Sequence, residues 1–505
     1  MSRGTLTADR LALSTGEPGG IDVARRFLGR PLRHYIGGEM TESADGATFD
    51  VVSPATGETI ASACAAGTTE VEAAVAAARE AFDDGRWRKL TLLEREMIML
   101  RLADLVEAAA DELSVLEVLD NGMPQAFARG TAIRAATIIR YYAGYLTKIE
   151  GTLNPVDPGF LSYSRREPMG VCVGITPWNG PLYVAVSKIA PAIGCGNTMV
   201  LKPAEDTPVT ATRLGELCQE AGLPAGVVNI VHGDGGVGAS LVANPDVDKI
   251  SFTGSTEVGK QIQKVASERL ARVTLELGGK SPDIVFADAN LDITVPGTVN
   301  AVYANTGQRC IAGSRLLVER SVHDELAERF AKAAGELVVG DGFHERTQLG
   351  PLISSTQFDR VAGYVDLGVE EGADLVAGGG QWEGEGFFAE PTIFANVDND
   401  MRIAREEVFG PVVTVLPFDS EEEAIAIGND TRYGLAAGIW STDASRIHRV
   451  TEQLQAGMVW ANCYGLYPMG VGFGGFKESG YGRELGSPSI DVYTQVKSLI
   501  QRTDV

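Results

Sequence analysis

The chain has 505 residues, of which 44% are hydrophobic and 22% charged, and its formal net charge is −24. This length predicts more than one domain, and this composition supplies the large core of a globular protein. The excess of negative charge argues against nucleic acid and anionic membrane as partners, and it does not otherwise select a function. No apolar run reaches the ~18 residues that a membrane-spanning helix needs.

The first 31 residues lack the apolar segment of a secretory signal and mix arginines with acids. We interpret residues 1–31 as an N-terminal extension that is flexible or loosely docked. The six cysteines form no CxxC pair, which favours a reducing cytoplasm as the location. The five histidines are scattered along the chain, so we expect no metal site.

Two long helical patterns come first in the chain, over residues 70–82 and 93–122, and the second ends in an Asn-Gly stop signal. Short apolar runs then alternate with amphipathic segments, which indicates parallel βαβ units. The predicted strands cover residues 170–178, 197–203, 226–233, 249–255 and 272–279, and the helices between them cover residues 208–220 and 256–270. Ligands bind at the carboxyl ends of such strands, where Lys202, Ser255 and Glu276 lie.

A second α/β pattern begins after residue 310, with a strand in "SRLLVERS" and a helix in "HDELAERFAKAAGEL". Further strands are predicted in "EEVFGPVVTVLPF", "GLAAGIWS" and "GMVWAN". Residues 489–502 alternate partly with period two. This alternation predicts a strand at the end of the chain that pairs with another segment or another subunit.

Two glycine-rich segments match the G-x-G-x-x-G pattern of dinucleotide-binding loops, residues 233–238 and 470–475, in a chain with 60 glycines. The first follows a predicted strand, as the pattern requires. In "FTGSTEVG", however, Gly254 and Gly259 frame another helix N-terminus, which is an equally good anion site. The pattern alone leaves both sites open. We interpret residues 470–475 as a turn-rich loop.

Cys310 lies in "NTGQRCIAGSR", among polar and glycine neighbours, whereas Cys64 and Cys172 lie in apolar contexts. A nucleophilic cysteine needs a base and an oxyanion site. Glu276, in "LELGGKSP", is a candidate base because its flanking leucines would raise its pKa. Asn179, in "TPWNGP", could donate to an oxyanion. The alternatives are a buried structural thiol, a solvated strand-end carboxylate and a turn asparagine.

Seven stretches occur in the order seen in the aldehyde dehydrogenase superfamily: "TPWNGP", "LKPAEDTP", "FTGSTEVG", "LELGGKSP", "GQRC", "EEVFGPV" and "GFGGFKESGYGRELG". The chain resembles this family from residue 32 to the C-terminus. The resemblance implies an α/β fold with a Rossmann-like cofactor domain, a second α/β catalytic domain and a small β oligomerisation arm, in a homotetramer or homodimer. The implied boundaries are 32–146 and 166–276 for the NAD-binding domain, 277–486 for the catalytic domain, and 147–165 with 487–505 for the arm.

The same resemblance implies oxidation of an aldehyde to a carboxylic acid, with Cys310 as the nucleophile that forms a thiohemiacetal and then a thioester. Asn179 and the Cys310 backbone N–H would hold the oxyanion, and Glu276 would activate the hydrolytic water. Lys188 and Glu484 resemble further active-site charges.

The family places the pyrophosphate of the cofactor at the "GSTEVG" helix. Lys202 and Glu205 resemble the ribose ligands, and the Glu205 carboxylate favours NAD because it would repel the 2′-phosphate of NADP, which is the alternative cofactor. The cofactor-binding residues implied are Thr176, Pro177, Trp178, Lys202, Ala204, Glu205, Gly235, Gly254, Ser255, Gly259, Leu277, Gly278, Glu407 and Phe409.

The chain departs from common family members at Gly180, Val186 and Ala304, where aromatic residues are frequent. We therefore expect a bulky, mainly apolar aldehyde, aromatic, terpenoid or medium-chain, since each position widens the channel. The expected substrate residues are Gly180, Tyr183, Val186, Ala304, Ile311, Leu466 and Phe473, with Tyr467 and Met469 as further walls. The late loop shows no arginine or acidic cluster that would orient a charged substrate.

The alternatives are a broad-range or semialdehyde-type dehydrogenase and a CoA-acylating member, which generally lacks a glutamate at the Glu276 position. A non-catalytic member and a cysteine hydrolase that binds no nucleotide are more distant rivals.

Overall fold

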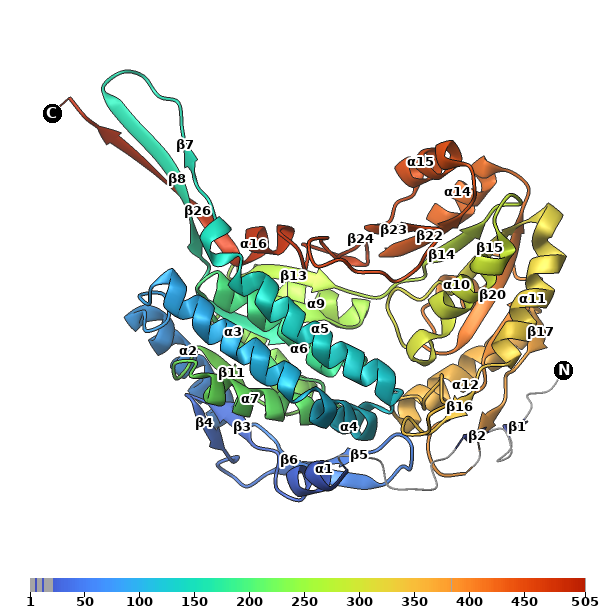
Figure 1. Ribbon diagram of the computed structural model, residues 1–505, viewed down its shortest axis with the longest axis horizontal. Helices are drawn as coiled ribbons and strands as arrows, with labels where there is room; N and C mark the ends of the chain where they lie inside the picture. Colours follow the sequence, from blue (N-terminus) through green and yellow to red (C-terminus); the bar gives the residue numbers. More distant parts are fainter. Residues whose placement is uncertain (1–4, 7–10, 13–20, 383, 505) are drawn as a thin grey trace.

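The computed structural model describes residues 5–6, 11–12, 21–382 and 384–504, and Figure 1 shows two α/β bodies with a projecting β arm. The sheet of the first body has the strand order β25-β13-β12-β9-β10-β11-β3-β4, in which β9 to β13 are mutually parallel. This arrangement makes the first body Rossmann-like. Its strands are β3 (His34–Ile36), β4 (Glu39–Thr41), β9 (Val171–Ile175), β10 (Thr198–Lys202), β11 (Val228–Ile230), β12 (Lys249–Thr253), β13 (Arg272–Glu276) and β25 (Gly480–Tyr481).

Helices cover both faces of this sheet, and their apolar sides form two core clusters with it. They are α2 (Thr68–Asp84), α3 (Leu92–Ala108), α4 (Ala110–Asn121), α5 (Gln125–Ala143), α6 (Pro181–Gly194), α7 (Val209–Ala221), α8 (Gly235–Ala243) and α9 (Thr256–Ser267). The long helix predicted over residues 93–122 is instead two helices. Ala109 leaves the helical conformation at ψ 7°, and the break lets α3 and α4 pack separately on α5.

The second sheet has the order β17-β19-β20-β15-β14-β22-β23, and all of its pairs are parallel except β17 with β19. Its strands are β14 (Pro282–Val285), β15 (Arg315–Glu319), β17 (Asp374–Ala377), β19 (Thr392–Ala395), β20 (Val412–Phe418), β22 (Ala436–Trp440) and β23 (Met458–Ala461). The helices of this body are α10 (Leu291–Tyr303), α11 (His323–Gly335), α12 (Ser355–Glu370), α13 (Arg402–Arg405), α14 (Glu421–Asn429) and α15 (Ala444–Gln453).

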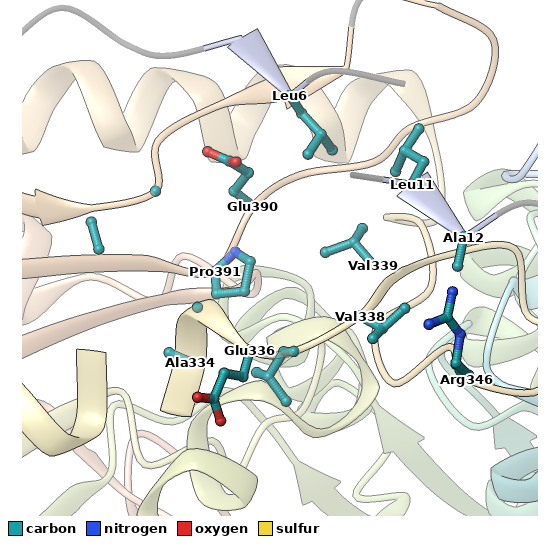
Figure 2. Close-up of a pocket in the computed structure, with 14 residues that line it drawn as sticks. Leu6, Leu11, Ala12, Ala334, Glu336, Val338, Val339, Arg346, Glu390 and Pro391 are labelled. Carbon is teal, nitrogen blue, oxygen red and sulfur yellow. The ribbon is translucent and has the colours of Figure 1, made fainter. Parts of the chain in front are cut away.

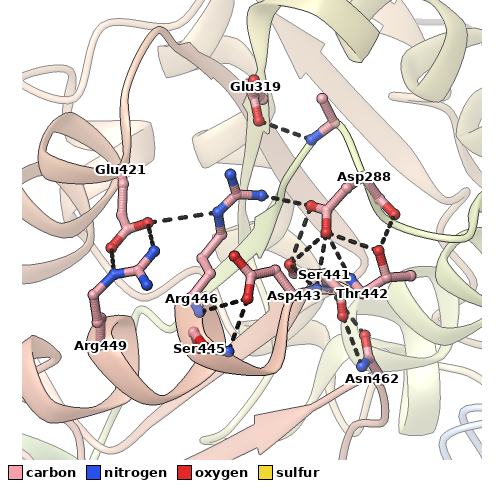
Figure 3. A network of polar contacts seen from close by, with 11 residues as sticks. Asp288, Glu319, Glu421, Ser441, Thr442, Asp443, Ser445, Arg446, Arg449 and Asn462 are labelled. Carbon is pink, nitrogen blue, oxygen red and sulfur yellow. Dashed lines mark hydrogen bonds and ion pairs between the residues drawn. The ribbon is translucent and has the colours of Figure 1, made fainter.

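The half-buried carboxylate of Asp288 connects the turn after β14 to the junction of β22 and α15 (Figure 3). It accepts hydrogen bonds from Ser441 Oγ and the Thr442 backbone N–H at 2.8 Å, the Asp443 N–H at 3.0 Å, and Arg446 Nη1 at 2.6 Å. Burial alone would raise the pKa of this carboxyl, but the hydrogen bonds from Ser441 and Thr442 hold its pKa below the ordinary value. The network fixes one end of the second sheet.

The arm is a three-stranded antiparallel sheet of β7 (Thr152–Leu153), β8 (Phe160–Pro168) and β26 (Thr494–Arg502), and it projects from the body (Figure 1). The strand predicted over residues 489–502 begins later than expected, because Pro488 opens a short helix, α16 (Pro488–Tyr493). Strand β8 continues three residues past the position 165 expected for the end of this part of the arm.

The N-terminal segments dock on the body of the molecule. β1 (Thr5–Leu6) pairs with β18 (Gln381–Trp382), and β2 (Leu11–Ala12) pairs with β16 (Val339–Gly340). Leu6 and Leu11 are buried beside a cavity of about 330 Å³ (Figure 2). α1 (Ile21–Leu28) packs against α4 and β6. The described segments of residues 1–31 are thus docked on the body by strand pairing and by the packing of α1.

The remaining short strands form two pairs, β5 (Thr48–Val52) with β6 (Thr59–Cys64) and β21 (Tyr433–Gly434) with β24 (Phe476–Lys477). Within the described ranges, no helix is both long enough and apolar enough to cross a membrane.

Candidate active site

The carboxyl ends of the first sheet face the second body across a cavity of about 550 Å³. Cys310, Glu276 and Asn179, the three expected catalytic residues, all line this cavity. Its other lining residues include Pro177, Trp178, Gly254, Ser255, Leu277, Gly278, Glu407 and Phe409. The fold thus gathers side chains from both bodies, which are far apart in the sequence, around one space.

A strained loop presents Cys310 to the cavity. Asn305 and Thr306 adopt left-handed conformations, with φ of 53° and 56°, which non-glycine residues seldom adopt. Gly307 follows with φ 70°, and a Cβ atom there would lie 2.1 Å from the Gly410 carbonyl oxygen. Gln308 anchors the loop, since its Oε1 accepts a 3.0 Å hydrogen bond from the Ile353 backbone N–H. These contacts fix the backbone of the loop that carries the Cys310 thiol.

Burial raises the pKa of the Cys310 thiol to about 12, and the nearby Glu407 and Glu276 carboxylates add to the shift. These surroundings favour the protonated thiol over the thiolate. A cysteine in this state needs a proton acceptor, or a positive charge beside it, before it can act as a nucleophile.

Glu276 is buried at the end of β13, and neither of its carboxylate oxygens has a hydrogen-bond partner among the described residues. Burial raises its pKa well above the ordinary value, the Glu484 charge adds to the rise, and Lys188 opposes it. A carboxyl group with a raised pKa and free oxygens, in the same cavity as a thiol, is suited to accept a proton during a reaction.

Lys188 and Glu484 form a buried ion pair close to Glu276. Lys188 Nζ also donates to Thr253 Oγ1 at 2.8 Å and to Ser251 Oγ at 3.1 Å, and Ser251 Oγ lies 2.9 Å from Glu484 Oε1. The pair satisfies its own charges within the core, which leaves Glu276 without a hydrogen bond from either residue.

Asn179 is held in place by its neighbours. Its Nδ2 donates to the Gln308 carbonyl at 2.8 Å, and Asn305 Nδ2 donates to the Asn179 carbonyl at 3.1 Å. Asn121 Nδ2 donates to the Trp178 carbonyl at 2.7 Å, on the preceding residue. The Asn179 amide has a second N–H, which is the donor that an oxyanion beside Cys310 would require.

Glu407 lines the cavity and lies close to the backbone of two glycines. Glu407 Oε1 accepts a 2.9 Å hydrogen bond from the Gly279 N–H, and burial raises its pKa to about 7. A Cβ atom on Gly278 would lie 2.3 Å from Glu407 Oε2, so a side chain there would displace the Glu407 carboxylate. The Trp178 and Phe409 rings meet edge to face at 5.2 Å.

The two candidate anion sites differ in structure. At the start of α8, Asp234 already caps the helix, with its Oδ1 accepting from the Gly236 and Val237 N–H groups at 2.8 and 3.3 Å. The Asp234 carboxylate therefore already binds the N–H groups that a bound anion would need. At the start of α9, Ser255 accepts from Val258 alone, and Ser255 lines the cavity. The geometry therefore favours α9 over the G-x-G-x-x-G segment.

The other expected cofactor residues lie outside this cavity: Thr176, Lys202, Ala204, Glu205, Gly235 and Gly259. Lys202 Nζ donates to Glu205 Oε2 at 2.9 Å, and Glu205 lines a second cavity of about 550 Å³. A Cβ atom on Gly259 would lie 2.6 Å from the Leu277 side chain, so glycine lets α9 approach the end of β13.

The expected substrate residues differ in burial and in the side chains they pack against. Tyr183 and Phe473 are half-buried, and the Phe473 ring meets the Tyr467 ring edge to face, with 5.7 Å between their centres. Val186 is 1% exposed within the first core cluster, against which Tyr183 and Phe473 also pack, and its place in the aldehyde channel stays a prediction. Its helix turns the next residue, Ser187, towards Glu484 at 3.5 Å.

Three further substrate candidates have different surroundings. Ile311 is buried in the core of the second body, and Leu466 is 61% exposed. Ala304 caps the end of α10 and is half-buried. Gly180 has open space, because a Cβ atom there would meet only Val184, at 3.4 Å.

Two arginines that the sequence did not single out lie against Tyr467. Arg134, from α5, donates to the Tyr467 carbonyl, and Arg309 Nη2 donates to the Tyr467 hydroxyl at 3.4 Å. Both arginines come from outside the late loop, whose own sequence contains no arginine. Further residues that line the cavity were also missed, because no local pattern marks them: Gln357, Arg360, Tyr364, Arg432 and Tyr433.

The profile of the aldehyde dehydrogenase family matches residues 40–499, and the chain belongs to this family. It is similar to an aldehyde dehydrogenase of the fungus Alternaria alternata, with 46% identity over 93% of this chain and 95% of the relative. Betaine aldehyde dehydrogenase of Bacillus subtilis is 45% identical over 93% of this chain and 97% of that protein. The NAD⁺ complex of the Bacillus cereus aldehyde dehydrogenase superposes with a TM-score of 0.94, at 44% identity over 95% of this chain and 98% of that chain.

Proposed function

We propose that the chain oxidises an aldehyde to a carboxylic acid with NAD, through a covalent intermediate on Cys310. The observation that carries this proposal is the meeting of Cys310, Glu276 and Asn179 in one cavity. The residues around that cavity fit NAD. The start of α9, where Ser255 accepts a hydrogen bond from the Val258 N–H alone, suits a pyrophosphate, and Gly278 lets the backbone lie close to Glu407.

Each residue then has a defined task. The Cys310 thiol gives its proton to water and its sulfur adds to the aldehyde carbon, while the Asn179 amide and the Cys310 N–H hold the oxygen as it gains negative charge. Loss of a hydride from that carbon would then leave a thioester on Cys310. NAD, when bound, supplies the hydride acceptor that the oxidation requires. Glu276 takes a proton from the water that hydrolyses the thioester, and the acid leaves as the Cys310 thiol is restored.

NAD is favoured over NADP by Glu205, whose carboxylate contacts Lys202 at the carboxyl end of β10. A 2′-phosphate would meet that negative charge at close range. Hydrolysis is favoured over transfer to CoA by the buried, unpartnered oxygens of Glu276, which are suited to activate water. The six cysteines are free thiols, which agrees with a cytoplasmic location.

The substrate that fits best is a bulky aldehyde with an apolar, aromatic or medium-chain body. The open space at Gly180 and the aromatic side chains of Tyr183, Tyr467 and Phe473 support this substrate class. Aromatic walls add dispersion and stacking contacts to each further carbon atom of the substrate.

The test is the formation of NADH from purified protein, NAD and a series of aldehydes of graded size. We expect turnover that Cys310→Ala abolishes and that Cys463→Ala, a change at another half-buried cysteine, leaves largely intact. NAD should still protect the Cys310→Ala variant from heat, because a ligand that binds only the folded state stabilises it. Turnover by Cys310→Ala at the wild-type rate would contradict the proposal.

A further inference from the structure

Arg432 reaches the cavity that holds Cys310 from the second body, in the segment between α14 and β21. Its Nη2 atom donates to Glu257 Oε1 at 3.2 Å and to the Tyr433 hydroxyl at 2.8 Å. Glu257 belongs to the first body, where it lies in the first turn of α9 and also lines the cavity. The Arg432 guanidinium therefore joins the two bodies at the start of α9.

Glu257 creates an electrostatic conflict at this place. A carboxylate in the first turn of a helix is stabilised by the helix dipole, but a pyrophosphate bound at the same helix start would meet its like charge. The effect of Glu257 reaches into the cavity, since burial raises the pKa of Glu407 to about 7 and the charge of Glu257 adds to the rise. An anion at α9 therefore needs a cation close to Glu257.

Carboxyl groups outnumber cations around the cavity. The charged residues among the described lining are Glu257, Glu276, Glu406, Glu407, Arg360 and Arg432. Arg360 is already committed to the backbone, because its Nη2 atom donates to the Glu407 carbonyl at 2.6 Å and its Cζ atom lies 5.2 Å from the centre of the Tyr364 ring. Arg432 is the lining cation that contacts the first turn of α9.

The present ion pairs of Arg432 are weak. Its side chain is 44% exposed and that of Glu257 is 64% exposed, and exposed pairs of this kind contribute little to stability. The distance from Arg432 Nη1 to Glu478 Oε2 is 3.7 Å, and Lys260 lies closer to that oxygen, at 2.9 Å. The Tyr433 ring, 4.9 Å from Arg432 Cζ, supports the guanidinium from one side. An exchange of Glu257 for a stronger anion therefore costs little.

We propose that Arg432 binds the pyrophosphate of NAD at the start of α9, and that Glu257 holds the guanidinium in this place while the cofactor is absent. A guanidinium can donate two parallel hydrogen bonds to a phosphate group. The inference rests on the proposed function and adds to it a cofactor ligand from the second body. Glu257 and the pyrophosphate then compete for one cation, so these two residues should affect NAD binding in opposite directions.

Isothermal titration calorimetry with NAD, in the absence of any aldehyde, tests the two directions. Arg432→Gln should raise the Kd by about threefold or more, the size expected for a partly exposed charge-assisted hydrogen bond. Glu257→Gln should leave the Kd unchanged or lower it, because it removes the competing anion. Lys264→Gln is the control, since it removes an exposed positive charge from α9 at a position that does not line the cavity, and it should keep the wild-type Kd.

Titration with ADP-ribose, which has the pyrophosphate and lacks the nicotinamide, locates the contact. The loss in Arg432→Gln should be equal for ADP-ribose and NAD, and a loss confined to NAD would overturn the inference. A smaller rise of the Kd in Arg432→Gln would also overturn it. So would weaker binding by Glu257→Gln, because the ion pair would then only hold the two bodies together. A wild-type protein that binds no NAD would instead contradict the proposed function, so the two failures are distinguishable.

Discussion

Glu276 is a residue whose surroundings oppose its charged form. Its carboxyl group is buried, both oxygens lack hydrogen bonds within the described chain, and Glu484 adds a like charge nearby. An ionised carboxylate is destabilised in such a place, and the raised pKa expresses that destabilisation. Groups held in unfavourable states at reaction centres often trade stability for activity.

The raised pKa of Glu276 gives a stability prediction with a definite sign. As pH rises above the ordinary carboxyl pKa, the unfolded chain loses this proton while the folded chain keeps it, so the folded state becomes progressively less stable. Glu276→Gln removes this effect. We expect its thermal midpoint to exceed that of the wild type at pH 8, by on the order of a few degrees, and to match it near pH 4.

Differential scanning calorimetry of both proteins across this pH range is the measurement. Glu72→Gln, a change at an exposed carboxylate of α2, serves as the control and should shift neither midpoint. A midpoint for Glu276→Gln that is lower than the wild type at pH 8 would contradict the electrostatic account of this residue.

Strand β26 is the element whose exposed apolar residues lack an explanation within one chain. It pairs with β8 over nine residues, yet Val496 is 64% exposed and Ile500 is 69% exposed. β8 adds exposed side chains at Phe160 and Leu161. Exposed apolar strands beside a free edge favour association, so we expect the arm to pair with another subunit in a homodimer or homotetramer.

The double variant Val496→Glu and Ile500→Glu should shift the protein to a smaller assembly, because it places charges in an apolar contact. Light scattering after size-exclusion chromatography measures the mass directly. Gln501→Glu, at a polar position of the same strand, should leave the mass unchanged. An unchanged mass in the double variant would exclude the arm as the main contact.

The elements that sequence patterns predict best are the buried parallel strands of the first sheet. Residues 249–255 and 272–279 are predicted as strands, and β12 and β13 begin at the same residues. Short apolar runs that end at glycine are typical of buried strands. Strand β14 was missed, since it is only four residues long, follows β13 after five residues, and shows no alternation. Helices α5 and α6 were not singled out either, because burial extends around much of their surfaces and weakens the amphipathic pattern.

At the scale of the whole molecule, the site exists only when both bodies are in place. Asn179 and Glu276 come from the first body, whereas Cys310 and Glu407 come from the second. Ordered motifs are enough to predict these residues as a group. They are not enough to predict Arg134, which is remote from Cys310 in sequence and reaches Tyr467 only through the packing of α5.

The central claim is that Cys310 carries the acyl group and that Glu276 removes it. The most direct measurement is mass spectrometry of Glu276→Gln after rapid mixing with NAD and an oxidisable aldehyde. The amide side chain cannot accept the proton of the attacking water, so hydrolysis should stall after one equivalent of NADH. We predict an intact mass increased by one acyl group, located by peptide mapping on Cys310. Full steady-state turnover without any adduct, or an adduct on another residue, would contradict the account.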